Sequence, residues 1–371
     1  MSETYLDLAA LLQPFPGDQP AGQDPRSDIS PQSLYFRLRD ARAEARQAER
    51  MAEHDLLEAG VPAAWSRVRQ YATTILDDIG KDIEVATWLT EALVREGGLI
   101  GLMESTLLLT GLVNDFWNSG LFPLPDEDGI EGRTVSLAGL NGTGGDGTLM
   151  QPLRQLVLFD RPDQTPVMIW RYQRAEEVEG LGDETQKQQR IAAGTWIFSE
   201  LEAEARGYGA EKLAEAGRAA RTALEAWKRL DAVLTAVAGQ EAPPMGRIAS
   251  AIEKIVRVAE YLVPERLADS EASASSPDEP MEGMAAVEAV RDASGRPVSQ
   301  PRPTRESMLR TLSEVADFFR KHEPQSPLAY TLDEAVRRGR MAWPELLAEI
   351  VQDDQVRAMI QSHLGIRPVY E

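Results

Sequence analysis

The chain has 371 residues, a formal net charge of −21, 43% apolar residues, 6% aromatic residues and no cysteine. The lack of cysteine excludes thiol catalysis, thiolate metal sites and disulfides. The acidic balance argues against binding to nucleic acid, which normally leaves a basic footprint. The length suggests two or three folded units, and abundant Ala, Leu, Glu and Arg favour helices, so we expect a mainly α-helical protein.

The sequence carries no clear targeting or membrane signal. The opening stretch MSETYLDLAALLQPF lacks a basic region and contains Glu3 and Asp7, which is not typical of a signal peptide. The most hydrophobic stretch, Leu99–Val113, is interrupted by Glu104 and is shorter than the roughly 20 residues that a bilayer span needs. We therefore expect a cytoplasmic protein with no membrane span.

The N-terminal region predicts a bundle of antiparallel helices. After a Pro- and Gly-rich lead-in, the pattern predicts a helix from about Pro31 to Ala59 and an amphipathic helix that stops at Gly80. Asp82 is a candidate N-cap for a third helix, which should end at the glycine pair 97–98 before a separate apolar helix, Leu99–Trp117. The short connections imply that consecutive helices are neighbours.

The middle of the chain is weakly patterned at first and strongly helical later. We expect a short helix around Thr134–Leu140, a brief strand at VLF (157–159), and strand or loop in PVMIWRYQRAEEVEG (166–180). Further helices are predicted at 184–204, 210–237 and 245–262. The inner face of the last should contain Ile248, Ile252, Ile255, Val256, Ala259 and Tyr261.

The C-terminal third divides into a linker and a small bundle. Residues 270–303 are rich in Ser, Pro, Glu and Gly and bury too little surface to fold, which predicts a flexible linker. The helix after Thr304 should point Met308, Leu312, Val315, Phe318 and Phe319 inward, and two or three helices follow. So small a core is marginal alone, and self-association would stabilise it. The predicted domains are 1–158, 159–269, 270–303 and 304–371.

Three patterns that suggest a ligand site fail on their spacing. The glycine cluster Asn141–Thr148 lacks the lysine of a phosphate-binding loop, so we interpret it as a tight structural loop. The acidic run Asp126–Gly129 lacks the spacing of a calcium loop. The histidines, His54, His322 and His363, are far apart and outside any metal-binding frame. We therefore expect no catalytic, cofactor or metal site.

Most of the tryptophans lie at apolar helical positions, which favours core packing over a stacking platform. Trp343 precedes Pro344 in the small terminal bundle, where an aromatic side chain often anchors an interface. Our hypothesis is that self-association involves this residue and its apolar neighbours, against the alternative that they only fill the local core. The residues are Tyr330, Trp343, Leu346, Leu347 and Ile350.

Two blocks of the sequence resemble a known family. Phe116–Arg154, with the helices before it, resembles the ImpA N-terminal domain, and Phe318–Val351 resembles the C-terminal E-P-x-S-P region of TssA proteins from bacterial type VI secretion systems. The motif residues of the first block are Trp117, Pro123, Asp126, Asp128, Gly129, Arg133, Asn141 and Gly142. Those of the second are Glu323, Pro324, Ser326 and Pro327.

The resemblance implies a role in assembly rather than catalysis. Proteins of this family associate with the baseplate, coordinate polymerisation of tail tube and sheath, and form rings through their C-terminal regions. Their partners would therefore be further copies of the chain and the tail proteins, with no cofactor. Two alternatives remain: a monomeric adaptor, which would sediment as a single chain, and a cryptic hydrolase, which would need a convergent polar site.

Overall fold

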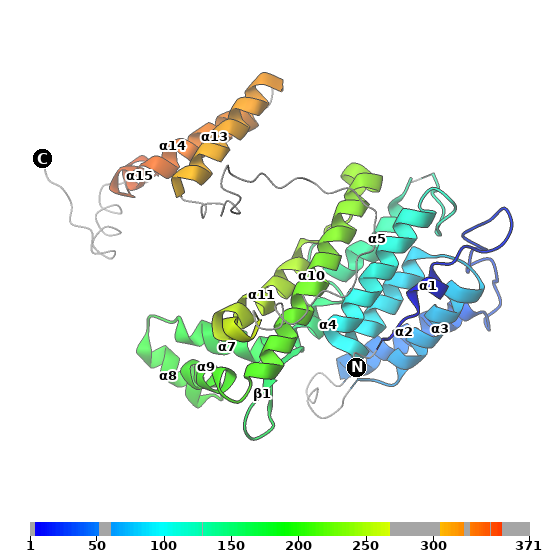
Figure 1. Cartoon of the computed structure of the whole chain (residues 1–371), viewed down its shortest axis with the longest axis horizontal. Helices are drawn as coiled ribbons and strands as arrows, with labels where there is room; N and C mark the ends of the chain where they lie inside the picture. Colours follow the sequence, from blue (N-terminus) through cyan, green and yellow to red (C-terminus); the bar gives the residue numbers. More distant parts are fainter. Residues whose placement is uncertain are drawn as a thin grey trace, which may run out of the picture. The chain divides into compact units, whose positions relative to one another are not determined.

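The computed structural model describes residues 4–51, 61–127, 129–267, 305–322, 327–341 and 343–350. It divides the chain into two compact units, Met1–Asp278 and Glu279–Glu371. The predicted class is confirmed, because the described chain is mainly α-helical with a single two-stranded sheet (Figure 1). The predicted linker, 270–303, lies outside the described residues.

The first unit begins with packed helices whose apolar faces meet. Helix α2 packs on α3, and α3 packs on α4 (Figure 1). Trp65, Val68 and Ile75 on α3 are fully buried, as their helical spacing predicts. The bounds are α1 (Leu8–Leu11), α2 (Leu34–Met51), α3 (Ala64–Asp78), α4 (Ile83–Phe116), α5 (Glu131–Asn141) and α6 (Met150–Arg154).

The prediction of two helices separated by the glycine pair is confirmed at Gly98. The segment labelled α4 is interrupted there, because Gly98 has the non-helical angles φ 55° and ψ −128°. Glycine adopts this conformation without a steric penalty, so the chain kinks and a second helical stretch follows. The start was predicted correctly, since the Asp82 carboxylate accepts a hydrogen bond of 2.9 Å from the Val85 N–H.

Gly98→Ala is expected to lower the free energy of unfolding by about 1–3 kcal/mol, because L-residues rarely adopt its backbone conformation. The new methyl group would also lie 3.2 Å from the Leu156 Cδ2 atom. Gly139→Ala is the matched control, since its position in α5 is helical and has open space around it. The control should be neutral or stabilising by up to about 1 kcal/mol. Thermal unfolding of both variants tests this, and equal midpoints would contradict it.

The second half of the unit contains a hairpin followed by a series of α-helices. The predicted VLF strand is confirmed as β1, which pairs antiparallel with β2. The strand-or-loop prediction for 166–180 was wrong beyond Met168, and the single helix predicted at 184–204 is two helices separated by a turn at Gly194 (φ 96°). The bounds are β1 (Val157–Asp160), β2 (Pro166–Met168), α7 (Ile169–Glu179), α8 (Glu184–Ala192), α9 (Phe198–Arg206), α10 (Ala210–Ala238), η1 (Gly239–Glu241) and α11 (Gly246–Leu262).

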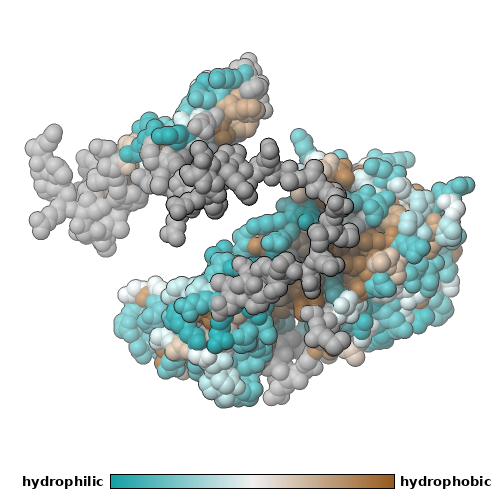
Figure 2. Space-filling model, viewed as in Figure 1, coloured by the Kyte–Doolittle hydropathy of each residue, from teal (hydrophilic) through white to brown (hydrophobic). Residues whose placement is uncertain are grey.

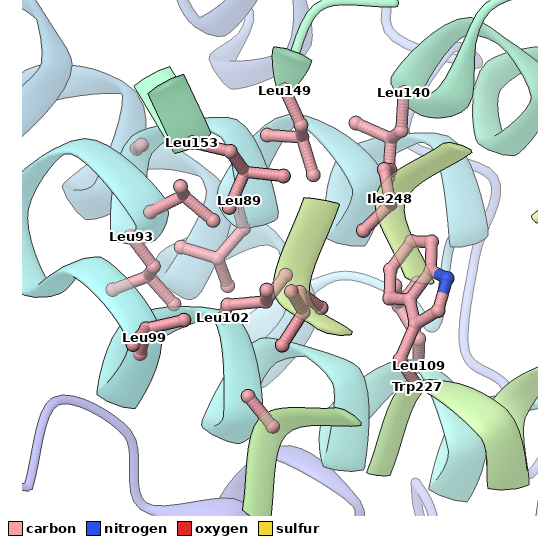
Figure 3. Packing of buried hydrophobic residues seen from close by; sticks show 14 of the residues in the cluster. Leu89, Leu93, Leu99, Leu102, Leu109, Leu140, Leu149, Leu153, Trp227 and Ile248 are labelled. Carbon is pink, nitrogen blue, oxygen red and sulfur yellow. The ribbon is translucent and has the colours of Figure 1, made fainter. Parts of the chain in front are cut away.

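Helix α10 joins the two halves of the unit into one hydrophobic core. It packs against both α4 and α11, and Trp227 lies close to Leu109, Leu140 and Ile248 (Figure 3). At Gly217 an added Cβ would lie 2.5 Å from the Ala259 Cβ, so α10 and α11 approach closely there. Residues 1–158 and 159–269 both contribute to this core. The predicted domain boundary between them stays a prediction.

The apolar sequence of helix α4 is explained by its burial in the first unit. Among the described residues, it is the helix that is long and apolar enough to cross a bilayer by length and composition. However, 67% of its most apolar window is buried inside the unit. The core helix of a soluble protein passes the same test, and burial on both sides accounts for the apolar sequence.

The inner face predicted for α11 was wrong at one position. Tyr261 is 63% exposed, whereas Val258 and Leu262 are buried together with Ile248 and Ile252. At about 100° per residue, position 261 lies on the side of the helix opposite Ile248. The apolar body of the tyrosine misled the prediction, and the helical period places it in solvent.

The second unit contains three described helices, α13 (Arg305–His322), α14 (Leu328–Arg340) and α15 (Trp343–Ile350). Helices α13 and α14 lie side by side (Figure 1), and Ala316, Ala329 and Val336 are buried. The inward face predicted for α13 was wrong at three positions: the exposed fractions are 38% for Leu312, 37% for Val315 and 54% for Phe318, while Phe319 is partly buried. The pair packs through small residues, so the larger apolar side chains stay outside. The side chain of Met308 lies outside the described residues.

Candidate interaction sites

The loop between α4 and α5 is held by one arginine. The Arg133 guanidinium donates three hydrogen bonds to backbone carbonyl oxygens: Nε to Pro123 at 2.8 Å, and its two terminal nitrogens to Trp117 at 2.8 Å and Leu121 at 2.6 Å. Its Cζ atom also lies 4.9 Å from the Trp117 ring centroid. Three of the predicted motif residues, Trp117, Pro123 and Arg133, therefore meet in one clamp.

The clamp fixes the backbone of the loop. Arg133 is buried, and among the described residues it contacts backbone carbonyl oxygens and the Trp117 ring. Burial lowers the pKa of the Arg133 guanidinium, because removal from water disfavours the charged form. An arginine nevertheless stays protonated in proteins. The group therefore serves as a fixed donor that shapes the loop.

The tip of this loop is a solvent-facing turn. Asp126 and Gly129 exchange two backbone hydrogen bonds of 3.1 Å, and Gly129 has φ 81°. Both residues are exposed, as is Leu124, while Asp128 lies outside the described residues. Among the described residues, no group of three or more His, Cys, Asp or Glu side chains is placed to hold a metal ion. The acidic tip is therefore a candidate for contact with another protein.

The glycine cluster forms a tight loop between α5 and α6, and its first residue is bonded to α11. Asn141 is buried, and its Oδ1 accepts a hydrogen bond of 3.0 Å from the Ile248 N–H in the first turn of α11. Gly142 has φ 81°, and a Cβ there would lie 2.2 Å from the Gly145 carbonyl oxygen. A Cβ at Gly147 would lie 2.1 Å from the Leu140 carbonyl oxygen. The loop conformation therefore requires glycine at both positions.

Two polar networks near the N-terminus were missed by sequence reasoning. The Arg26 guanidinium in the lead-in bonds to the carboxylates of Asp82 and Glu84, which raises the pKa of Arg26 against the opposing effect of burial. Tyr35 donates to Glu84 at 2.8 Å, and burial together with this carboxylate raises its pKa to about 12. The D-P-R sequence of the lead-in was the available signal, because it places an arginine in a segment that is otherwise unpatterned.

Lys81 forms the second network. Its ammonium is buried and donates hydrogen bonds of 2.8 Å to the carbonyl oxygens of Leu11 and Leu76. Burial lowers the pKa of Lys81, and the nearby Asp77 partly opposes this shift. The lysine ties the N-terminal segment to the end of α3, so both networks support the fold rather than a reaction.

Among the five residues of the predicted C-terminal interface, those that the structure describes differ in how far they are buried. Tyr330 on α14 is 69% exposed, whereas Leu346 is partly buried and Leu347 is buried within its own unit. Trp343 and Ile350 begin and end α15, and their side chains lie outside the described residues. The interface hypothesis for these five residues therefore stays a prediction, and Tyr330 is the described member that is open to a partner.

The E-P-x-S-P motif lies just before α14. Glu323, Pro324 and Ser326 are outside the described residues. The Pro327 carbonyl oxygen accepts hydrogen bonds of 3.1 Å from both the N–H and the hydroxyl of Thr331. The end of the motif thus starts the helix. Figure 2 shows hydrophobic residues on the surface of this unit. The exposed apolar side chains of α13 are Leu312, Val315 and Phe318.

Comparison with known proteins agrees with this architecture. Residues 12–142, which contain the arginine-clamped loop, match the family model described as ImpA, N-terminal, type VI secretion system. The chain is 27% identical over 354 residues to the type VI secretion system component TssA1 of Pseudomonas aeruginosa, covering 94% of this chain and 96% of that protein. Residues 12–142 thus resemble the ImpA N-terminal region, and the chain as a whole is similar to a TssA component of a type VI secretion system.

A solved structure agrees with the same assignment. The chain is similar in structure to the N-terminal domain, including the conserved ImpA_N region, of the TssA component of the type VI secretion system from Burkholderia cenocepacia. The match has a TM-score of 0.57 and 27% identity, and it covers 72% of this chain and 97% of that chain. The family resemblance seen in the sequence is thereby confirmed.

Proposed function

We propose that this protein is a non-enzymatic, cytoplasmic assembly component that associates with the type VI baseplate and coordinates tail tube and sheath assembly as a multimeric ring. Its similarity to TssA1 along 94% of the chain carries the proposal, because it spans both the N-terminal unit and the C-terminal helices. The polar networks support a structural role, since the buried charges described above hold backbone segments together.

Self-association is argued from the exposed side chains of the C-terminal unit. Leu312, Val315 and Phe318 are spaced three residues apart and therefore share one side of α13, and Tyr330 adds an exposed aromatic ring on α14. Burial of apolar surface contributes about 25 cal/mol per Å². Because the core of this unit is built largely from small residues, contact with a second copy would supply the burial that the unit itself lacks.

A ring follows when each copy uses one surface to contact a different surface of the next. Such head-to-tail contacts close into rings if the rotation between copies closes. A ring would then present many copies of the first unit, whose acidic loop tip at Asp126 and Gly129 would contact tail proteins. Weak contacts of this kind gain strength from multivalency, since binding of one copy raises the effective concentration of the others.

Val315→Glu combined with Tyr330→Ala is expected to reduce the mass of the full chain in solution from a multiple of 40.9 kDa towards a single chain. A charge on the contact surface opposes its burial, and the smaller side chain removes an anchor. Light scattering measures the mass. Ile29→Glu is the matched control, because Ile29 is highly exposed but lies in the first unit, and it should leave the mass unchanged.

Two outcomes contradict the proposal. A wild-type chain that is monomeric favours the adaptor alternative over a ring. An unchanged large mass in the double variant, with helix content intact by circular dichroism, removes the α13–α14 surface from the interface. Trp343→Ala, measured in the same way, then tests whether α15 carries the contact.

A further inference from the structure

A small pocket lies between α7 and the turn that joins α8 to α9. Its volume is about 190 Å³. It belongs to the first unit but lies outside residues 12–142, which match the ImpA family model. The lining residues are Trp170, Arg171, Arg174, Ala193, Gly194, Thr195 and Trp196. Two indole rings, two guanidinium groups and one hydroxyl are thus gathered in a small space.

The two arginines carry charge that the fold does not neutralise. Arg171 and Arg174 are three residues apart on α7 and therefore neighbours on its surface. Among the described residues, neither forms an ion pair or a hydrogen bond with a carboxylate. The neighbouring Arg161 differs, since it holds Glu204 through two hydrogen bonds of 2.7 and 2.9 Å. In a chain with a net charge of −21, a pair of unneutralised arginines facing one pocket is a distinctive feature.

The Arg171 guanidinium is held by aromatic rings instead of by an acid. Its Cζ atom lies 4.6 Å from the Trp196 ring centroid and 5.2 Å from the Trp170 ring centroid. Burial alone lowers the pKa of Arg171, with no opposing contribution from a carboxylate. Stacking on the faces of the rings leaves the N–H edges of the guanidinium available to an acceptor.

A buried hydroxyl in the pocket wall also lacks a partner. Thr195 is only 6% exposed, and its Oγ1 forms no hydrogen bond. A buried polar group without a partner costs stability, and such groups are few in folded proteins. The backbone of Thr195 is fixed by a hydrogen bond of 3.1 Å from its N–H to the Arg190 carbonyl oxygen. The hydroxyl is therefore kept at the pocket despite its cost.

The walls of the pocket are pre-formed by packing on the opposite side of α7. Tyr172 is buried and contacts Phe198 of α9 edge-to-face, with 5.3 Å between the ring centroids. Arg161 supports Trp196 from the hairpin, with its Cζ atom 5.0 Å from the indole centroid. A pocket held in this way binds without first being ordered, which lowers the entropic cost of binding.

We propose that the pocket formed by Trp170, Arg171, Arg174, Thr195 and Trp196 binds the carboxylate side chain of an acidic protein segment. Guanidinium groups form charge-assisted hydrogen bonds with carboxylates, and the hydroxyl supplies a further donor. The indole rings contact the methylene groups of the bound side chain. The volume admits a single acidic side chain.

Two sources can supply this carboxylate. One is an acidic segment of a partner protein. The other is the chain itself, whose residues 270–283 read SEASASSPDEPMEG and contain four acidic residues. The two sources share the same chemistry at the pocket, and they differ in whether the site of the full chain is already occupied.

Calorimetric titration of the full chain with a synthetic peptide of residues 270–283 tests the proposal. We expect saturable binding that Arg171→Gln and Arg174→Gln each weaken about tenfold, because each removes a charge-assisted bond. Arg229→Gln is the matched control, since Arg229 is an exposed arginine on α10 away from the pocket, and it should bind as the wild type does. Thr195→Val should weaken binding about threefold without lowering the thermal midpoint, because it removes a buried hydroxyl that has no partner.

A variant chain with Glu271, Asp278, Glu279 and Glu282 replaced by their amides distinguishes the two sources of the carboxylate. Its affinity for the peptide is compared with that of the wild-type chain. Tighter peptide binding by this chain than by the wild type identifies the chain's own segment as the occupant, and equal binding identifies a partner segment. The proposal is overturned if neither chain binds the peptide, or if the Arg171 and Arg174 variants bind it as the Arg229 variant does. It is also overturned if inorganic phosphate binds at the pocket and the peptide does not.

Discussion

Arg133→Ala is expected to lower the free energy of unfolding by about 3–5 kcal/mol, because it leaves three backbone carbonyl oxygens without their donor. Those oxygens belong to Trp117, Leu121 and Pro123, and all three bonds are 2.8 Å or shorter. The alanine also removes the stacking of the guanidinium on the Trp117 ring. Denaturant unfolding of the full chain measures the loss.

Arg133→Lys separates the role of the charge from that of the geometry. An ammonium group keeps the positive charge but has no planar fork with which to reach three divergent acceptors. We expect the lysine variant to recover less than half of the stability lost in the alanine variant. Faster hydrogen exchange at 117–133 should accompany both changes. A lysine variant as stable as the wild type would show that charge, rather than the three-way clamp, holds the loop.

Trp227→Ala is expected to cost about 3–5 kcal/mol, since a large buried side chain is replaced by a cavity. The indole is fully buried where α10 packs against α4 and α11 (Figure 3), and its Nε1–H donates to the Met245 carbonyl oxygen at 3.0 Å. The variant should loosen the joint between the ImpA-type region and the helices that follow it. Thermal unfolding with circular dichroism gives the shift of the midpoint.

Trp227→Phe is the control that keeps most of the volume. It removes the hydrogen bond to Met245 and leaves a smaller gap, so we expect a loss of about 1–2 kcal/mol. If the alanine and phenylalanine variants lose the same stability, the hydrogen bond rather than the packing dominates at this position. If neither loses stability, Trp227 is not part of the shared core.

The sequence predicted the elements of the fold well where one physical signal dominates. Apolar spacing located α3, α10 and α11, and the capping chemistry of Asp82 located the start of α4. The glycine pair located the interruption between the two helical stretches of α4, because Gly98 adopts a positive φ that regular helix does not allow. By contrast, the apolar face of α13 was recognised, but periodicity alone does not say what covers it.

The candidate sites were predicted as residues and not as arrangements. The family motif identified Arg133 and Asn141, but the partners of Arg133 are backbone carbonyl oxygens. Such groups are the same in every residue, so no sequence pattern reveals them. The pocket of Arg171 and Thr195 was missed for a related reason. Between its two walls, Arg174 and Ala193, lie 18 residues that include the whole of α8, and only the folded chain brings the walls together.

The packing of α4 against α10 also has a consequence for the synthesis of the protein. About 90 residues separate the end of α4 from the start of α10. At about 5–20 residues per second, a ribosome needs roughly 5–20 s to make that stretch. During this interval the apolar helix α4 has been synthesised, but α10, which covers it in the folded unit, has not. Closure of the core therefore comes late in translation, and it depends on a segment beyond the region that defines the family.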